Sequence, residues 1–72
     1  MNIYQRLKYI REDADKSQEE IAKILGTSQS YYAQYENGKR SIPFDRVILL
    51  AKYYNVSLDY IAGLSDVPKK IN

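Results

Sequence analysis

The side chains that could carry out chemistry in this 72-residue chain are limited, because the sequence contains no cysteine and no histidine. Their absence excludes disulfide bonds, thiolate or imidazole zinc sites, and catalysis by Ser-His-Asp or Cys-His arrangements. Carboxylates, lysines, serines and tyrosines remain, but they form no paired base and nucleophile, and the chain has no glycine-rich phosphate-binding loop. The sequence therefore predicts that the protein is not an enzyme and that it needs no cofactor.

Four carboxylates within residues 13–20 are the cluster that most suggests a cation site. A calcium-binding EF-hand loop that began at Asp13 would need glycine at its sixth position and glutamate at its twelfth. This chain has Gln18 and Ile24 at those positions. We therefore interpret the acidic stretch as a linker followed by a helix cap, and we predict no metal site.

Uncharged hydrogen-bonding side chains form a second group, within residues 29–34. Gln29, Ser30 and Gln34 share one side of a helix if Tyr32 and Tyr35 face the core. A glutamine can pair with adenine N6 and N7 through two hydrogen bonds, and a serine hydroxyl can contact several base edges. This face therefore has the size and the chemistry to enter a DNA major groove. The alternative is that these three side chains are simply solvated.

The elements that would position these residues are helices, because the hydrophobic pattern has a helical period and shows no sustained alternation. The predicted helices cover residues 3–13, 18–25, about 29–36, about 43–54 and a short stretch within 57–63. The second helix has the clearest boundaries, since Ser17 and Glu20 form a capping box before it and Gly26 follows it. The expected fold class is all-α, with five short helices.

The length and composition fit one globular domain. Hydrophobic residues make up 44% of the chain, charged residues make up 28%, and the net charge of +2 gives only a weak preference for anionic partners. We expect the domain to cover residues 1–64 and residues 65–72 to form a frayed C-terminal tail. The longest apolar run, residues 47–51, is five residues long, whereas a membrane helix needs about 20. We therefore expect no membrane segment and a cytoplasmic location.

Two short helices joined across Gly26, the second of which opens with small polar residues, have the spacing of a helix-turn-helix. From Ile3 to about Leu64 the sequence resembles the helix-turn-helix domain of lambdoid phage repressors and Cro, the xenobiotic-response-element family of bacterial regulators. The residues that carry the resemblance, in the family's order and spacing, are Gln18, Ile21, Ala22, Gly26, Thr27, Ser28, Tyr32, Tyr35, Glu36, Asn37, Gly38, Pro43, Leu50, Ala51, Val56, Ser57, Leu58 and Ile61. The resemblance implies a compact five-helix, lambda-repressor-like DNA-binding domain with its helix-turn-helix in the second and third helices.

Tyrosines are the departure from the family pattern. Tyr32, Tyr35 and Tyr54 stand where family members usually have aliphatic or other apolar residues. A buried tyrosine needs a hydrogen-bond partner for its hydroxyl, or a route for that hydroxyl to solvent. The sequence therefore predicts the third helix but leaves its packing open.

The resemblance also implies roles for individual side chains. Gln29, Ser30 and Gln34 match the base-reading positions of the family, on a recognition helix over about residues 29–36. Phosphate contacts are expected, by resemblance or by position at the helix ends, from Gln18, Ser28, Asn37, Lys39 and Arg40. Arg11 and Glu36 match a pair that forms an internal salt bridge in phage members. The alternatives are an ordinary solvated turn at residues 39–40 and two independent surface charges.

The resemblance and the polar face together predict a transcriptional regulator that binds a pseudo-palindromic operator in double-stranded DNA as a symmetric homodimer. Its two third helices would lie in major grooves about 34 Å apart. The predicted dimer surface is an apolar patch made by Ile48, Leu49, Tyr53 and Tyr60. Repressors, antitoxins and restriction-modification controller proteins all use this fold, and no small-molecule ligand is implied. The alternative from another class is a helical protein-interaction module that does not bind DNA.

Overall fold

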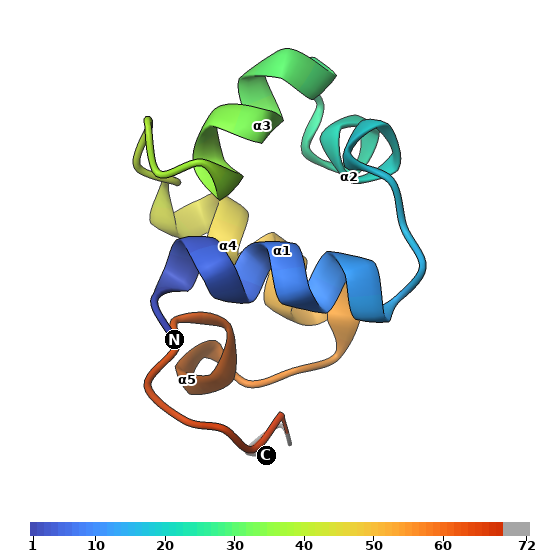
Figure 1. The fold of residues 1–72 in the computed structure, drawn as a ribbon. Coiled ribbons are helices and arrows are strands. Elements are labelled where there is room, and N and C mark those ends of the chain that lie inside the picture. Colours follow the sequence, from blue (N-terminus) through green and yellow to red (C-terminus); the bar gives the residue numbers. More distant parts are fainter. Residues whose placement is uncertain (69–72) are drawn as a thin grey trace.

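The structure, a computed structural model, describes residues 1–68. This part of the chain contains five helices (Figure 1). They are α1 (Ile3–Asp13), α2 (Gln18–Leu25), α3 (Gln29–Glu36), α4 (Phe44–Tyr54) and α5 (Leu58–Ile61). The predicted all-α fold class, with a helix-turn-helix at α2 and α3, is therefore confirmed. The fourth helix begins one residue later than predicted, because Pro43 keeps an extended backbone and serves as the N-cap of α4.

Local hydrogen bonds fix the ends of the two helices in the motif. At the start of α2, Ser17 Oγ accepts a hydrogen bond from the Glu20 N–H at 3.1 Å, and Glu20 Oε1 accepts one from the Ser17 N–H at 3.0 Å. At the start of α3, Ser28 Oγ accepts one from the Tyr31 N–H at 3.1 Å. Gly26 ends α2 at φ +71°, a conformation that costs glycine less than any other residue. The turn between the helices is thus set by its own residues.

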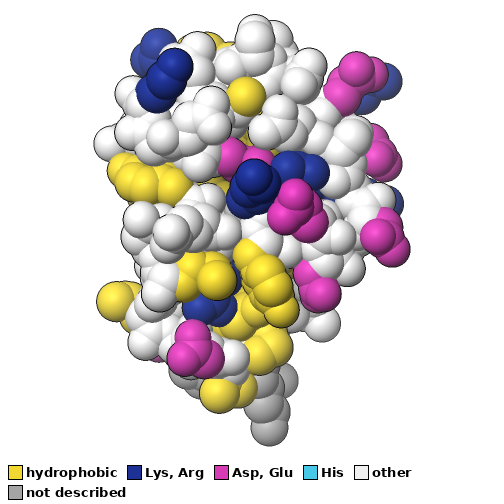
Figure 2. All heavy atoms as spheres, viewed as in Figure 1, with side chains coloured by type: hydrophobic (Ala, Val, Ile, Leu, Met, Phe, Trp, Pro, Cys, Tyr) yellow, Lys and Arg dark blue, Asp and Glu magenta, His cyan; other side chains and the backbone are white. Residues whose placement is uncertain are grey.

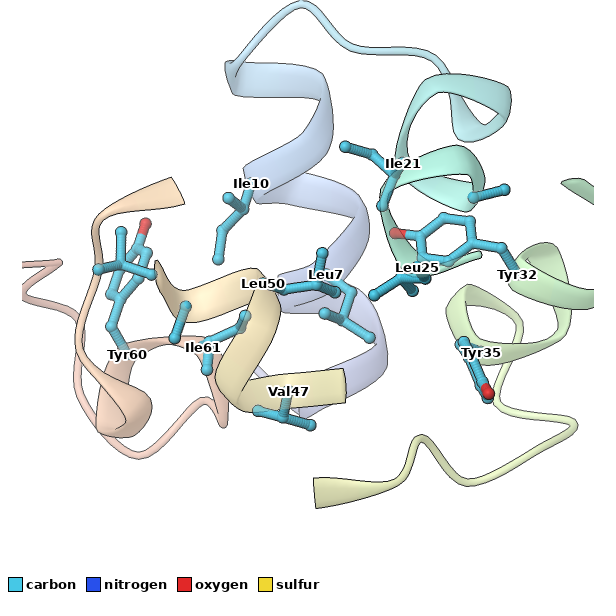
Figure 3. Packing of buried hydrophobic residues seen from close by; sticks show 13 residues of the cluster. Leu7, Ile10, Ile21, Leu25, Tyr32, Tyr35, Val47, Leu50, Tyr60 and Ile61 are labelled. Atoms are coloured by element: carbon cyan, nitrogen blue, oxygen red, sulfur yellow. The ribbon is translucent and has the colours of Figure 1, made fainter. Parts of the chain in front are cut away.

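The hydrophobic core joins all five helices (Figure 3). Leu7 of α1, Leu50 of α4 and Ile61 of α5 are fully buried. Ile21 of α2 and Tyr32 of α3 are buried to the same extent, so the core continues into the helix-turn-helix. In Figure 1, α1 crosses the middle of the molecule, with α2 and α3 on one side and α5 on the other. The helix-turn-helix therefore packs on α1 through α3, and Arg46 of α4 reaches Tyr35 of α3.

Two of the core tyrosines obtain hydrogen-bond partners from charged side chains. Tyr32, which is 0% exposed, donates its hydroxyl hydrogen to Glu36 Oε2 at 2.6 Å. Tyr35, which is 1% exposed, accepts a hydrogen bond from Arg46 Nη1 at 2.9 Å. The Tyr54 hydroxyl is buried without a hydrogen-bond partner among residues 1–68, and burial raises the pKa of Tyr54. Two of the three tyrosines thus have the hydrogen-bond partner that a buried tyrosine hydroxyl needs.

The segment after α5 packs against the domain. Asp66 Oδ1 lies 3.0 Å from Arg6 Nη2, and the Pro68 carbonyl accepts a hydrogen bond from the Ser57 N–H at 3.2 Å. These contacts tie residues 66 and 68 to the domain, and the division into a domain over residues 1–64 and a C-terminal tail stays a prediction. Residues 69–72 of that prediction lie outside the described range.

Tyr60 is 9% exposed, and the Arg6 guanidinium lies 4.1 Å from its ring centroid. Its predicted place in an exposed apolar patch is therefore wrong. The reason is that α5 places this ring against the core, under the side chain of Arg6. Within the described range, none of the helices is long and apolar enough to cross a bilayer.

Candidate nucleic-acid interface

The third helix has one buried and one accessible side. Tyr32, Tyr35 and Glu36 are buried, whereas Gln29 and Ser30 are exposed and Gln34 is half-buried. Figure 2 shows a largely uncharged surface over α3, with Lys or Arg side chains at its upper left edge. The three residues predicted to read bases therefore share the accessible side of the helix, opposite Tyr32 and Tyr35, as the spacing of the two tyrosines predicts.

The buried carboxylate of Glu36 is the centre of a hydrogen-bond network beneath that surface. Arg11 Nε lies 2.7 Å from Glu36 Oε2, and Arg11 Nη2 lies 3.0 Å from Oε1. The Tyr32 hydroxyl donates to Oε2 at 2.6 Å, and Gln18 Nε2 donates to Oε1 at 3.2 Å. Arg11 and Glu36 are thus brought together in a two-pronged salt bridge that ties α1 to the end of α3.

The electrostatics of this network favour the charged carboxylate. Burial by itself would raise the pKa of Glu36, but hydrogen bonds from Arg11, Tyr32 and Gln18 lower that pKa below its ordinary value. The hydrogen bond to Glu36 raises the pKa of Arg11. Burial, followed by the hydrogen bond to Glu36, raises the pKa of Tyr32. The side chain of Glu36 is 1% exposed and that of Arg11 is 11% exposed, so this ion pair is screened little by water.

The network reaches the accessible face through two amides. Gln18 Oε1 accepts a hydrogen bond from Gln29 Nε2 at 3.1 Å. Because an ionised carboxylate only accepts, Gln18 must direct its NH2 group to Glu36 and its oxygen to Gln29. Gln29 must in turn direct one N–H to Gln18, which leaves its oxygen and its second N–H available. The sequence predicted Gln18 as a phosphate contact, and nothing in its spacing indicated this link to Gln29.

The residues predicted to contact phosphates lie on both flanks of the accessible face. Gln18 and Ser28 stand at the starts of α2 and α3, and Asn37, Lys39 and Arg40 lie just beyond the end of α3. The last three are exposed. Arg40 also contacts α3 itself, since its Nε donates to Gln34 Oε1 at 3.2 Å.

Residues 7–61 match the family model described as Helix-turn-helix. The chain belongs to the helix-turn-helix family. It is 39% identical over 64 residues to the uncharacterized HTH-type transcriptional regulator YobD of Bacillus subtilis (strain 168), an alignment that covers 89% of this chain and 57% of YobD. It is 36% identical over 70 residues to the HTH-type transcriptional regulator ImmR of the same organism, covering 97% of this chain and 55% of ImmR. The chain therefore spans little more than half the length of these relatives.

The fold of this helix-turn-helix protein is also that of a solved repressor. The crystal structure of the P22 c2 repressor protein in complex with synthetic operator 9T superposes with a TM-score of 0.79 at 20% sequence identity. The superposition covers 90% of this chain and 98% of that chain. The lambda-repressor-like architecture implied by the sequence is therefore confirmed.

Proposed function

We propose that this helix-turn-helix protein regulates transcription by binding double-stranded DNA in a sequence-specific way, with α3 in the major groove. The observation that carries the proposal is the accessible side of α3, where Gln29, Ser30 and Gln34 offer uncharged donors and acceptors. Neighbouring side chains hold both amides in place. An α-helix fits the major groove, and amides pair with base edges there. The names of YobD and ImmR as transcriptional regulators support the same function.

Backbone contacts would orient the helix in the groove. We propose that Gln18, Ser28, Asn37, Lys39 and Arg40 contact phosphates on the two sides of the α3 face. Such contacts set the register of a protein on DNA without reading sequence. A regulator of this kind acts on the chromosome or on phage DNA, so we place it in the cytoplasm.

The test of DNA binding is in vitro selection of the bound sequence, followed by binding measurements at several salt concentrations and by footprinting. We expect a pseudo-palindromic site and an affinity that falls as salt rises, because phosphate contacts release counterions. If the selection recovers no preferred sequence and the measured affinity does not depend on salt, the results favour the alternative, a protein-interaction module.

We further propose that the protein binds DNA as a symmetric dimer through an apolar groove beside α5. The residues that line the groove are Ile3, Ile42, Phe44, Val47, Leu58, Asp59, Ala62 and Leu64. Phe44 is 67% exposed and Leu64 is 80% exposed. Hydrophobic side chains also gather over the α1 and α5 end of the molecule in Figure 2. A twofold interface uses the same surface of both copies. Because Phe44 projects from the surface that carries the groove, Phe44 of each copy would enter the groove of the other.

Position supports this groove over the patch predicted on α4. Ile42 and Phe44 directly follow the loop that contains Lys39 and Arg40, so a contact there would bring the two phosphate-binding edges of a dimer together. Leu49 and Tyr53 of the predicted patch are 40% and 42% exposed, and with the half-buried Ile48 they lie outside the groove lining.

Sedimentation of two variants separates the two surfaces. We expect Phe44→Ser to shift the protein toward the monomer and to weaken operator binding, whereas Tyr53→Ser should change neither. Dissociation by Tyr53→Ser with an intact Phe44→Ser dimer would assign the interface to the outer side of α4.

A further inference from the structure

The side chain of Arg40 lies back against the recognition helix. Its Nε donates to Gln34 Oε1 at 3.2 Å, and its guanidinium carbon lies 4.6 Å from the centroid of the Tyr31 ring. Its backbone is fixed at the same place, since the N–H groups of Lys39 and Arg40 donate to the Gln34 carbonyl at 3.0 and 3.2 Å. Arg40 is therefore attached to the last turns of α3 through both its backbone and its side chain.

We propose that Arg40 determines sequence specificity by acting through Gln34, a role beyond the phosphate contact expected of a basic loop. The proposal rests on the proposed DNA-binding function and names how one of its base contacts is set. A guanidinium carries only donors, so the amide of Gln34 must direct its oxygen, and not its NH2 group, toward Arg40. The NH2 group of Gln34 then points away from Arg40 toward the groove, and one of the two lone pairs of its oxygen is already taken by Arg40.

The orientation of the amide decides which base edge it can pair with. Bidentate pairing with adenine requires the amide oxygen to accept from N6 while the NH2 group donates to N7. With its oxygen turned to Arg40, which takes one of its two lone pairs, Gln34 presents mainly its NH2 donors, and the matching base edges carry acceptors. Those edges are guanine O6 and N7, and thymine O4. We infer that Gln34 selects guanine or thymine and discriminates against adenine.

Gln29 supplies an internal comparison, because its neighbour imposes the opposite orientation. Gln18 occupies an N–H of Gln29 and leaves the amide oxygen available, whereas Arg40 occupies the oxygen of Gln34. Two side chains of one type, on one helix face, thus present different hydrogen-bonding groups. The difference comes from residues outside the face, which are Gln18 in α2 and Arg40 in the loop beyond α3.

The ring of Tyr31 holds the guanidinium of Arg40 in its orientation. This ring lies beneath Arg40 and is itself packed edge-to-face on Tyr35, with ring centroids 5.6 Å apart and planes at 86°. Tyr35 is 1% exposed, so the ring of Tyr31 rests on the core. The N–H donors of a guanidinium all lie in its own plane, so contact with an aromatic ring limits the directions in which they can point. Tyr31 is therefore a positioning residue for Arg40.

The experiment measures binding to four operators that differ only at the base pair read by Gln34, defined as the pair at which Gln34→Ala removes discrimination. For the unmodified protein we expect guanine or thymine to be preferred over adenine by about fivefold or more. Arg40→Ala should reduce this preference to less than about twofold, because the freed amide can also pair with adenine. Circular dichroism of each variant verifies that the fold is kept, and Arg40 is an exposed residue.

Two further variants separate specificity from charge. Tyr31→Leu keeps the charge of Arg40, and we expect it to reduce the same preference, with no additional loss when it is combined with Arg40→Ala. Lys39→Ala is the matched control, since it removes the neighbouring cation and should weaken binding to all four operators equally.

Equal weakening of all four operators by Arg40→Ala, with the preference intact, would overturn the proposal and leave Arg40 as a phosphate contact. A preference of the unmodified protein for adenine at that base pair would overturn it as well. If the unmodified protein selects no sequence at all, the proposed function fails together with this inference, which distinguishes that failure from the other two.

Discussion

Replacing Glu36 by glutamine tests whether the hydrogen-bond network beneath the accessible face of α3 stabilises the protein. The substitution keeps the shape of the side chain but replaces one acceptor oxygen by an NH2 group. Arg11 and the Tyr32 hydroxyl both donate to Glu36 Oε2, so in the variant either donors face donors or a buried group loses its partner. The Arg11 charge, with 11% of its side chain exposed, would also lose its counter-ion.

The magnitude follows from the burial of the pair. Removing one partner of a buried ion pair typically costs about 3–5 kcal/mol, whereas an exposed pair contributes about 0–1 kcal/mol. Because Arg11 is slightly exposed and glutamine can still accept one hydrogen bond, we expect a loss near the lower value, about 3 kcal/mol. For a domain of this size that loss corresponds to a decrease of roughly 12–24 °C in Tm.

Urea and thermal unfolding followed by circular dichroism measure the loss. Glu19→Gln is the matched control, since it makes the same chemical change at an exposed position of α2, and it should alter stability by less than about 0.5 kcal/mol.

The folded pKa of Glu36 lies below its ordinary value, so the unfolded chain binds more protons as the pH falls toward that value. The stabilisation is present above the unfolded pKa and is lost as the pH decreases, so the unmodified protein should lose stability in acid more steeply than Glu36→Gln. A change of less than about 1 kcal/mol at neutral pH would refute the buried-pair interpretation.

The remaining predictions concern the DNA contact and the helix ends. Gln29→Ala should weaken binding to the selected operator by about 1–3 kcal/mol and relax discrimination at one base pair, measured by titration against single-base operator variants, with Tm unchanged. Uniform weakening across all sequences would instead make Gln29 a phosphate contact. Gly26→Ala should cost about 1 kcal/mol in urea unfolding, because φ is +71° but a Cβ meets no atom within 4 Å. Gly63→Ala should cost more than Gly26→Ala, because a Cβ at Gly63 would collide with the Met1 carbonyl; equal costs would show that the chain ends adjust freely.

The sequence was sufficient where the information is local. Ser17, Glu20 and Gly26 set the boundaries of α2 through contacts within a few residues, so a capping box and a glycine predict them. The faces of α3 follow in the same way from the spacing of Tyr32 and Tyr35. Such features need no knowledge of what the helix packs against.

The parts that the sequence did not predict depend on contacts between distant residues. Tyr60 has the same polar and apolar character as an exposed interface tyrosine, and its burial depends on the approach of Arg6 from the distant helix α1. The link from Glu36 through Gln18 to Gln29 likewise requires three helices to meet. Amide orientation is not a property of any one residue, because it is set by whichever donor or acceptor the fold places beside it.

The net charge of +2 is compatible with DNA recognition because the charges have separate tasks. Arg11 and Glu36 neutralise each other beneath the surface and contribute no long-range attraction to DNA. In the proposed function, the exposed Lys39 attracts DNA at the edge of the face, and this contribution weakens as salt rises. In the proposed function, base discrimination comes from Gln29 and Gln34, which carry no charge and release no counterions. Raising the salt concentration should therefore reduce affinity for every sequence while leaving the ratio between preferred and mismatched operators nearly constant.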